Sequence, residues 1–148
     1  MPMRTNLAKC GLLFTLTLLA AVLLGGCAAA TPAERIARRY PLEAPRSDTL
    51  PIHVVVDSKR VEFTNSTGTV FGPSVLWLNQ WYSVAIDGMA VGQTLSIPIS
   101  AFVDEHGKQM RGGGFFATEA PERVIAAELR TADGLHGMPV VEPNTTSR

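Results

Sequence analysis

The fold class is decided by residues 52–64, whose sequence is IHVVVDSKRVEFT. The apolar side chains of this stretch that fall at alternate positions are Ile52, Val54, Val56, Val61 and Phe63. A tight turn near Ser58 separates the two runs. Because alternate residues of a strand point to opposite faces, this pattern is typical of strands with one buried face. The stretch therefore predicts a β-hairpin or two adjacent strands.

Short apolar runs continue toward the C-terminus and are broken by turn residues. The clearest of them are residues 75–78, 81–86, 95–99, 124–129 and 135–141. Seven or eight such runs recur along the chain, and no amphipathic helical window lies between them. This spacing predicts an all-β domain, a small antiparallel β-sandwich of short strands. By analogy of strand count alone, we expect the sandwich to be immunoglobulin-like.

Two of these runs leave details of the strand pattern open. Pro98 cannot donate a ladder hydrogen bond, so its strand is expected to lie at an edge or to be bulged. Residues 123–130 fit a strand in this spacing. They also fit a helix, because Ala127, Glu128 and Leu129 all favour one.

The N-terminal part of the chain has the pattern of a secretory leader. Arg4 and Lys9 precede residues 11–26, GLLFTLTLLAAVLLGG, which carry no charge. This block is short, since a bilayer-spanning helix needs roughly 20 residues. A positive start, a short apolar middle and small residues at the end favour a cleaved leader over the alternative, an uncleaved membrane helix.

The residues that close this block, Leu24-Gly25-Gly26-Cys27, resemble the lipobox of bacterial lipoproteins. The resemblance implies cleavage before Cys27 and covalent lipid, a diacylglycerol and an N-acyl chain, on that residue. Residues 1–26 would then be a signal peptide that the mature protein lacks. Ala28, where an aspartate would mark inner-membrane retention, implies an anchor in the outer membrane facing the periplasm.

The rest of the chain divides into three expected parts. Residues 27–50 read as the lipidated cysteine and a flexible tether, residues 51–142 as the β-sandwich and residues 143–148 as a disordered tail. A capping-box spacing near residue 31 allows a short helix over residues 32–40, and a frayed linker is the alternative.

Charge and cysteine content exclude several classes of function. Removal of the leader takes Arg4 and Lys9 from the 13 basic side chains and leaves 11, against 13 acidic ones. Nothing there suggests a nucleic-acid footprint, which needs a clustered basic face. The two cysteines are Cys10, in the leader, and Cys27. The mature fold would therefore hold no disulfide and no thiolate zinc site, and we expect no cofactor besides the covalent lipid.

Aromatic residues form the densest candidate site. The predicted interaction patch comprises Trp77, Trp81, Tyr82, Phe115 and Phe116. Aromatic side chains with polar tips suit a surface that docks a protein, a glycan or a lipid. The alternative is that some of them, Trp77 and Tyr82 among these, fill the core. Since Trp81 and Tyr82 are neighbours in a strand, both cannot point inward.

Catalytic and metal-binding patterns are weak. The three histidines fall in separate runs, and Asp104-Glu105-His106 is the closest approach to an acid–base or metal cluster. Consecutive turn residues rarely converge on one ion, so a solvated turn is the better interpretation. Arg111 followed by three glycines could form an anion-binding nest or a plain flexible loop. We expect neither a metal site nor a catalytic nucleophile, because no G-x-S-x-G is present.

The leading hypothesis is a lipid-anchored, periplasm-facing β domain that binds or scaffolds an envelope component without chemistry. A small envelope enzyme acting on glycan or phosphoester bonds, using Asp104, Glu105 or His106, is one alternative. An accessory subunit of a secretion or assembly complex is another.

Overall fold

The computed structural model describes residues 36–113 and 118–141. The predicted leader of residues 1–26, the lipidation site Cys27 and the predicted tail of residues 143–148 lie outside these ranges. So do Phe115 and Phe116. Among the described residues, no helix is both long enough and apolar enough to cross a bilayer.

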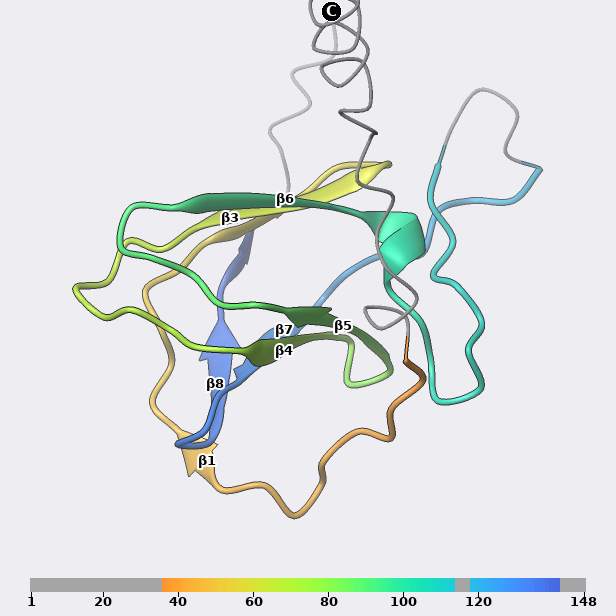
Figure 1. The fold of residues 1–148 in the computed structure, drawn as a ribbon. Helices are drawn as coiled ribbons and strands as arrows, with labels where there is room; N and C mark the ends of the chain where they lie inside the picture. Colours follow the sequence, from red (N-terminus) through yellow and green to blue (C-terminus); the bar gives the residue numbers. More distant parts are fainter. Residues whose placement is uncertain (1–35, 114–117, 142–148) are drawn as a thin grey trace, which may run out of the picture.

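The described chain folds into two sheets that pack as a sandwich (Figure 1). The five-stranded sheet has the order β1 (Arg46–Ser47), β8 (Leu135–Met138), β7 (Ala127–Arg130), β4 (Ser74–Leu78) and β5 (Tyr82–Ile86). The four-stranded sheet has the order β6 (Thr94–Pro98), β3 (Arg60–Thr64), β2 (Val54–Val56) and β9 (Val140–Val141). The predicted small all-β sandwich is confirmed.

The hairpin predicted from residues 52–64 is β2 and β3. Val54 pairs with Phe63 and Val56 pairs with Val61, in antiparallel register. The Asp57 carboxylate closes the turn by accepting hydrogen bonds from the backbone N–H groups of residues 59 and 60, both at 2.6 Å. Alternation along β3 buries Val61 and Phe63 and exposes the residues between them, as the sequence pattern requires.

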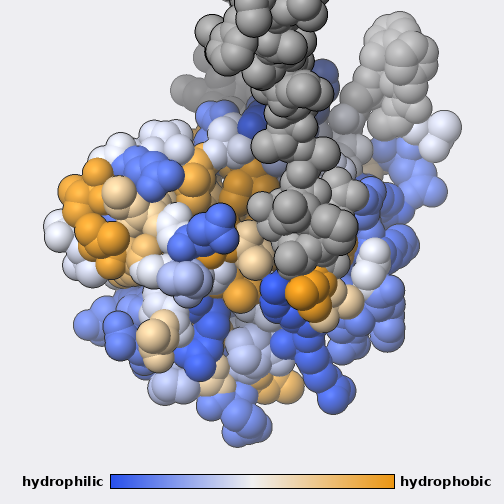
Figure 2. All heavy atoms as spheres, in the orientation of Figure 1, coloured by the Kyte–Doolittle hydropathy of each residue, from blue (hydrophilic) through white to orange (hydrophobic). Residues whose placement is uncertain are grey.

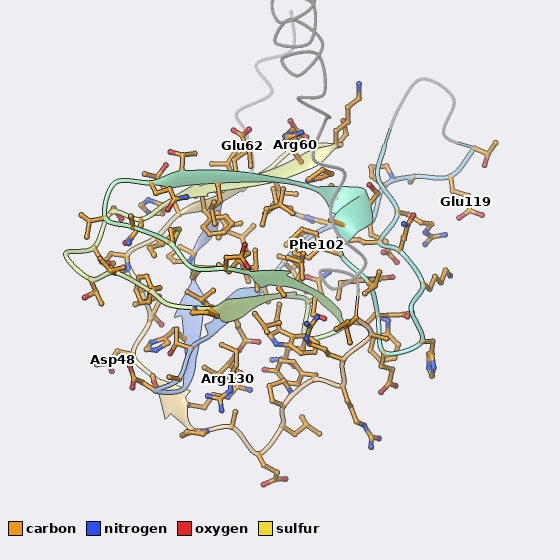
Figure 3. The ribbon with its side chains drawn as sticks, in the orientation of Figure 1. Asp48, Arg60, Glu62, Phe102, Glu119 and Arg130 are labelled. Atoms are coloured by element: carbon orange, nitrogen blue, oxygen red, sulfur yellow. The ribbon has the colours of Figure 1, made fainter. Side chains whose placement is uncertain are left out.

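The core lies between the two sheets. Phe63 of β3, Leu76 of β4 and Leu129 of β7 are buried there, together with Phe102 from the segment after β6 (Figure 3). Full burial of each such side chain contributes about 1.5–3 kcal/mol relative to exposure. Arg60 and Glu62, between the buried residues of β3, lie on the outer face of the four-stranded sheet (Figure 3).

Residues 127–130 form a strand, which decides between the two interpretations of that run. Leu129 of β7 pairs with Leu76 of β4 on one side and with His136 of β8 on the other. Helix propensity differs among ordinary residues by at most about 0.7 kcal/mol each. Hydrogen bonding of β7 to the strands on both of its sides therefore outweighs the helix propensity of its residues.

Strand β6 lies at an edge of its sheet, as Pro98 predicts. Its outer side is protected, because Arg60 donates from Nη2 to the carbonyl of Ser96 at 2.6 Å. The strand ends at Pro98 and the chain turns into the short 3₁₀ helix η2 (Ile99–Ala101). An edge that is capped by a cation and ended by proline resists pairing with another chain.

Residues 36–50, which we call the strap, cross the outer face of the five-stranded sheet, the face away from β3 and β6 (Figure 1, orange). They contain β1, which pairs in parallel with β8. The approach is close: a Cβ on Gly134 would meet the carbonyl oxygen of Pro45 at 2.9 Å. The predicted boundary between tether and domain at residue 50 is therefore corrected, because the strap is hydrogen-bonded to the sheet.

The strap contains no helix over residues 36–40, the described part of the short helix considered over 32–40. Two of the strand pairs are parallel, β1 with β8 and β2 with β9, and each involves a strand of two residues. The other pairs between strands are antiparallel, as predicted.

Candidate functional site

Trp77 belongs to the interior and not to an exposed patch. Its side chain is 2% exposed. Because it alternates with Leu76 and Leu78, which face the main core, it lies on the outer face of the five-stranded sheet under the strap. The Tyr40 ring contacts it edge-on, with ring centroids 5.3 Å apart. The predicted surface role of Trp77 is thus wrong, and the alternative of packing is right.

Trp81 and Tyr82 differ in burial: Tyr82 is the first residue of β5, and Trp81 lies in the turn before it. Tyr82 is 7% exposed and joins the main core, whereas Trp81 is 49% exposed. Burial, followed by a hydrogen bond to Glu122, raises the pKa of the Tyr82 phenol to about 12. Of the predicted patch, Trp81 is therefore the member that the described structure places at the surface.

The turn that presents Trp81 is rigid and locally strained. Asn79 and Gln80 have φ angles of 53° and 59°, in the left-handed region. Asn79 tolerates this conformation, and its side chain joins two segments. Its Nδ2 donates to the carbonyl of Arg123 at 2.8 Å, and its Oδ1 accepts from the N–H of Ile125 at 2.8 Å. Gln80 has no such adaptation, and strain of this kind is often found at functional sites.

A shallow pocket of about 360 Å³ lies between this turn and the strap, and we call it the strap groove. Its lining residues are Arg38, Arg39, Tyr40, Leu42, Asn79, Gln80, Trp81 and Glu105. Arg39 Nε lies 3.6 Å from Glu105 Oε2, and Arg38 donates from Nη1 to the carbonyl of Ile36 at 2.8 Å. The groove thus combines a half-exposed indole with two guanidinium groups and one carboxylate.

The groove keeps its shape because the strap is fixed by Glu128 of β7. This carboxylate is buried, and its Oε2 accepts a 2.7 Å hydrogen bond from the Tyr40 phenol. Arg46 of β1 forms an ion pair with Oε1, and its guanidinium also lies 5.8 Å from the centroid of the Tyr40 ring. Burial, followed by the bond to Glu128, raises the pKa of Tyr40.

Sequence reasoning missed this cluster of Tyr40, Arg46 and Glu128. One signal was available: Glu128 is a charged residue inside a run that otherwise reads as apolar. A carboxylate in a buried strand requires a partner, so it points to a cation or a donor from elsewhere in the chain.

Asp104, Glu105 and His106 form a turn and do not converge. Asp104 is buried, and its Oδ1 accepts hydrogen bonds from the backbone N–H groups of His106 at 2.9 Å and Lys108 at 2.8 Å. Burial acts to raise the pKa of this carboxyl, but these hydrogen bonds outweigh it and the pKa is lowered. Over the described ranges, no group of three His, Cys, Asp or Glu side chains could hold a metal ion.

The other two histidines lie apart from this turn. His136 of β8 contacts the carbonyl of Asp48 through Nδ1 at 3.0 Å and the hydroxyl of Thr131 through Nε2 at 3.2 Å. His53 is exposed beside a hollow on the outer face of the four-stranded sheet. His106 contacts Asp104 through its backbone N–H, and the structure brings neither His53 nor His136 to that turn.

Arg111 closes the base of a loop. Its guanidinium forms ion pairs with Glu119 and Glu122, and its carbonyl accepts from the N–H of Glu122 at 3.1 Å. The N–H of Gly113 donates to the carbonyl of Ser58 at 2.7 Å. Both groups are thereby engaged within the protein, so the loop interpretation fits better than an anion-binding nest.

Asn65 is a second residue whose structural role the sequence did not reveal. It is fully buried, and its Nδ2 donates to the carbonyls of Thr69 at 2.8 Å and Ala90 at 3.1 Å. Its Oδ1 accepts from the backbone N–H of Thr67 at 3.1 Å. This amide therefore joins the loops that follow β3 and β5.

Comparison of the chain with protein family models, with curated proteins and with solved structures finds no match.

Proposed function

We propose that this protein is a lipid-anchored component of a bacterial cell envelope, whose non-catalytic β-sandwich binds, scaffolds or assists the assembly of another envelope component. The observation that carries the proposal is Leu24-Gly25-Gly26-Cys27 at the end of an uncharged apolar block. A buried acyl methylene contributes about 0.8 kcal/mol, so two or three chains on Cys27 make an essentially permanent anchor. The outer membrane, with the domain facing the periplasm, is the proposed location.

The short connection between anchor and domain supports a function at the membrane surface. Eight residues, 28–35, lie between Cys27 and Ile36, where the described strap begins. Because an extended chain spans at most about 3.6 Å per residue, the strap lies within roughly 30 Å of the lipidated residue. The strap is itself bound to the five-stranded sheet through Tyr40 and Glu128. The anchor would therefore restrict the whole domain to the layer next to the bilayer.

The contacts of the candidate acid–base residues support a function without catalysis. Asp104 accepts hydrogen bonds within its own turn. Glu105 is close to Arg39 and to His106, at 3.6 and 3.7 Å, in a partly exposed cluster. A general acid or base needs a pocket that orders substrate and excludes water. The open strap groove is suited to contact with an envelope surface.

Mass spectrometry of the protein purified from envelopes tests the anchor. The expected product starts at Cys27 and carries the mass of a diacylglycerol and an N-acyl chain. A Cys27→Ser variant should retain the leader and lose the lipid. An unmodified thiol at Cys27 in the purified protein would contradict the proposal.

Co-purification from detergent-solubilised envelopes tests the binding function. The anchored protein should retain specific envelope components. The Cys27→Ser variant, expressed at the same level, should retain fewer, because it is not held at the same surface. Equal recovery of the same components by both proteins would argue that the anchor is irrelevant to partner choice.

A further inference from the structure

We propose that the strap groove and its rim form a docking surface for the phospholipid leaflet, with anionic headgroups at the arginines. The inference rests on the proposed lipid anchor and goes beyond it, because it assigns the face of the domain that contacts lipid. The surface comprises Ile36, Arg38, Arg39, Leu42 and Trp81.

The apolar residues of this surface are unusually exposed. Ile36 is 53% exposed, Leu42 is 75% exposed and Trp81 is 49% exposed. Leu42 and Trp81 line the same groove, and Ile36 is the exposed strap residue two positions before Arg38, which donates to its backbone carbonyl. Tryptophan is enriched where a membrane meets water, since the indole is apolar with a polar edge. Aliphatic side chains beside it add apolar area for insertion between headgroups.

The charges of the surface match anionic headgroups. Arg38 and Arg39 both line the groove, against the single carboxylate of Glu105. The Arg39–Glu105 pair is solvent-exposed and 3.6 Å long, and exposed pairs of this kind are weak. A phosphate can therefore replace Glu105 as the partner of Arg39. Basic side chains next to an anchored lipid are attracted to an anionic leaflet over roughly a Debye length.

The short connection to the proposed anchor would keep this small surface close to the membrane. Eight residues connect Cys27 to Ile36, so anchoring would hold this surface at a high effective concentration next to the leaflet. Weak individual contacts are then sufficient to orient the domain. The Asn79 side chain fixes the turn that carries Trp81, so the orientation is determined by a rigid element.

The same orientation turns the opposite end of the sandwich away from the lipid. That end is formed by the connections after β3 and β5 (Figure 1). Val70 and Val91, in these connections, are exposed. Figure 2 shows apolar side chains gathered over these connections, at the end of the strands remote from the turn that carries Trp81. The two ends therefore provide a test surface and a control surface.

A leaflet suits the groove better than a glycan. A sugar-binding site needs polar groups aimed into the pocket, and the Asn79 amide is engaged by Arg123 and Ile125. The groove is shallow and continues over the strap into a second hollow, of about 630 Å³, that shares Arg39 and Leu42. The two hollows together present three arginines, Arg38, Arg39 and Arg130, against the carboxylates of Glu43 and Glu105. An open, laterally continuous surface with this excess of arginine beside apolar side chains fits an extended lipid interface.

Tryptophan quenching by brominated lipid tests the proposal on the full, acylated protein. The chain has two tryptophans, and Trp77 is buried beneath the strap. In vesicles that contain brominated phosphatidylglycerol, the Trp77→Phe variant should show blue-shifted, strongly quenched emission from Trp81. The Trp81→Phe variant should show little quenching, because Trp77 is shielded. If Trp77→Phe fails to fold, the difference between the wild type and Trp81→Phe gives the same signal.

Two further sets of variants test separately whether the arginines contribute to docking and which end of the domain faces the leaflet. Changing Arg38 and Arg39 together to Gln should reduce the quenching at least several-fold, as should replacement of phosphatidylglycerol by phosphatidylcholine. A Val91→Trp reporter in the Trp81→Phe background should remain unquenched. Equal quenching at positions 81 and 91 would overturn the proposed orientation.

Mass spectrometry on the same samples distinguishes failure of this proposal from failure of the anchor. If Cys27 is acylated and Trp81 is unquenched, the leaflet proposal is overturned, the anchor stands and the groove is left for a protein or glycan. If Cys27 is unmodified, the anchor proposal fails. Quenching of that unacylated protein at high vesicle concentration would still support the docking surface, and its absence would overturn it.

Discussion

The Tyr40 hydroxyl donates a 2.7 Å hydrogen bond to Glu128 Oε2, and 88 residues of sequence separate the two. Tyr40 lies in the strap and Glu128 lies in β7. This contact and the ion pair between Arg46 and Glu128 attach the strap to the sheet. The segment that follows the proposed anchor is thereby part of the folded domain.

Removing the Tyr40 hydroxyl should destabilise the domain. We expect Tyr40→Phe to lower the free energy of unfolding by about 1–2 kcal/mol, because the buried Glu128 loses a donor. Tyr40→Ala should cost about 1 kcal/mol more, since the edge contact with Trp77 is also lost. Urea unfolding measures both, and a Trp81→Phe background isolates Trp77 fluorescence, which should shift to the red only in Tyr40→Ala. Equal stability of all three proteins would show that the strap is not bound in solution.

Two buried serines allow the effect of a hydroxyl without a hydrogen-bond partner to be compared with that of a hydroxyl that has one. Ser83 is fully buried, and its Oγ has no hydrogen-bond partner within the described part of the chain. Ser83→Ala should therefore raise the free energy of unfolding by about 1 kcal/mol. Ser74 is also buried, but its Oγ donates to the carbonyl of Gly72 at 2.8 Å. Ser74→Ala should lower the stability by about 1 kcal/mol, and effects of the same sign would contradict this account.

The strained turn before Trp81 should be relieved by glycine. Because Gln80 has a φ of 59°, Gln80→Gly should raise the free energy of unfolding by about 0.5–1 kcal/mol. Gln109 is an exposed glutamine whose φ is negative, so Gln109→Gly should lower the stability by about 0.5–1 kcal/mol. Thermal or urea unfolding checks both. Destabilisation by Gln80→Gly would mean that the Gln80 side chain makes a contact that outweighs the strain.

Alkaline pH should destabilise the protein through its two tyrosines. The pKa of Tyr82 is about 12 in the folded state, raised from 10.0, and the pKa of Tyr40 is also raised. The neutral phenols are thus favoured by folding, and their contribution is complete below pH 10 and lost as the pH rises toward 12. Absorbance at 295 nm should show little tyrosinate at pH 10 in the folded protein. Tyr82→Phe should flatten the pH dependence of stability above pH 10, and an unchanged profile would count against this assignment.

Replacement of the buried Asn65 by aspartate should destabilise the domain. In Asn65→Asp, the donors to Thr69 and Ala90 are lost and a carboxylate is buried, so we expect a loss of about 2–3 kcal/mol at pH 7. The loss should shrink as the pH falls toward about 4, because the buried carboxyl takes up its proton in the folded state at a higher pH than in the unfolded chain. Gln93 is the matched control, because its Oε1 only accepts, from the N–H of Ala90 at 2.8 Å. Gln93→Glu should therefore change the stability by less than about 0.5 kcal/mol.

Elements with a periodic local signal could be predicted from the sequence. The alternation at Val54, Val61 and Phe63 predicts the β2–β3 hairpin, and Pro98 predicts the edge position of β6. The two-residue strands β1 and β9 are too short to carry a period. They exist because their backbones pair with distant strands, which no local pattern reveals.

The candidate site was predictable only in part for the same reason. Adjacency in the chain predicts that Trp81 or Tyr82 is near solvent, and Trp81 is. The burial of Trp77 on the outer face depends on the strap, which reads as a tether by composition. Tyr40, Arg46 and Glu128 meet only in the folded chain, so their spacing carries no motif.

The parallel pairing of β1 with β8 determines when the domain can be completed. During synthesis residues 46–47 emerge early, but their partner strand follows only at residue 135. Every fragment that stops before β8 lacks the strand to which β1 is hydrogen-bonded. The five-stranded sheet is therefore completed only when nearly the last strand has been synthesised.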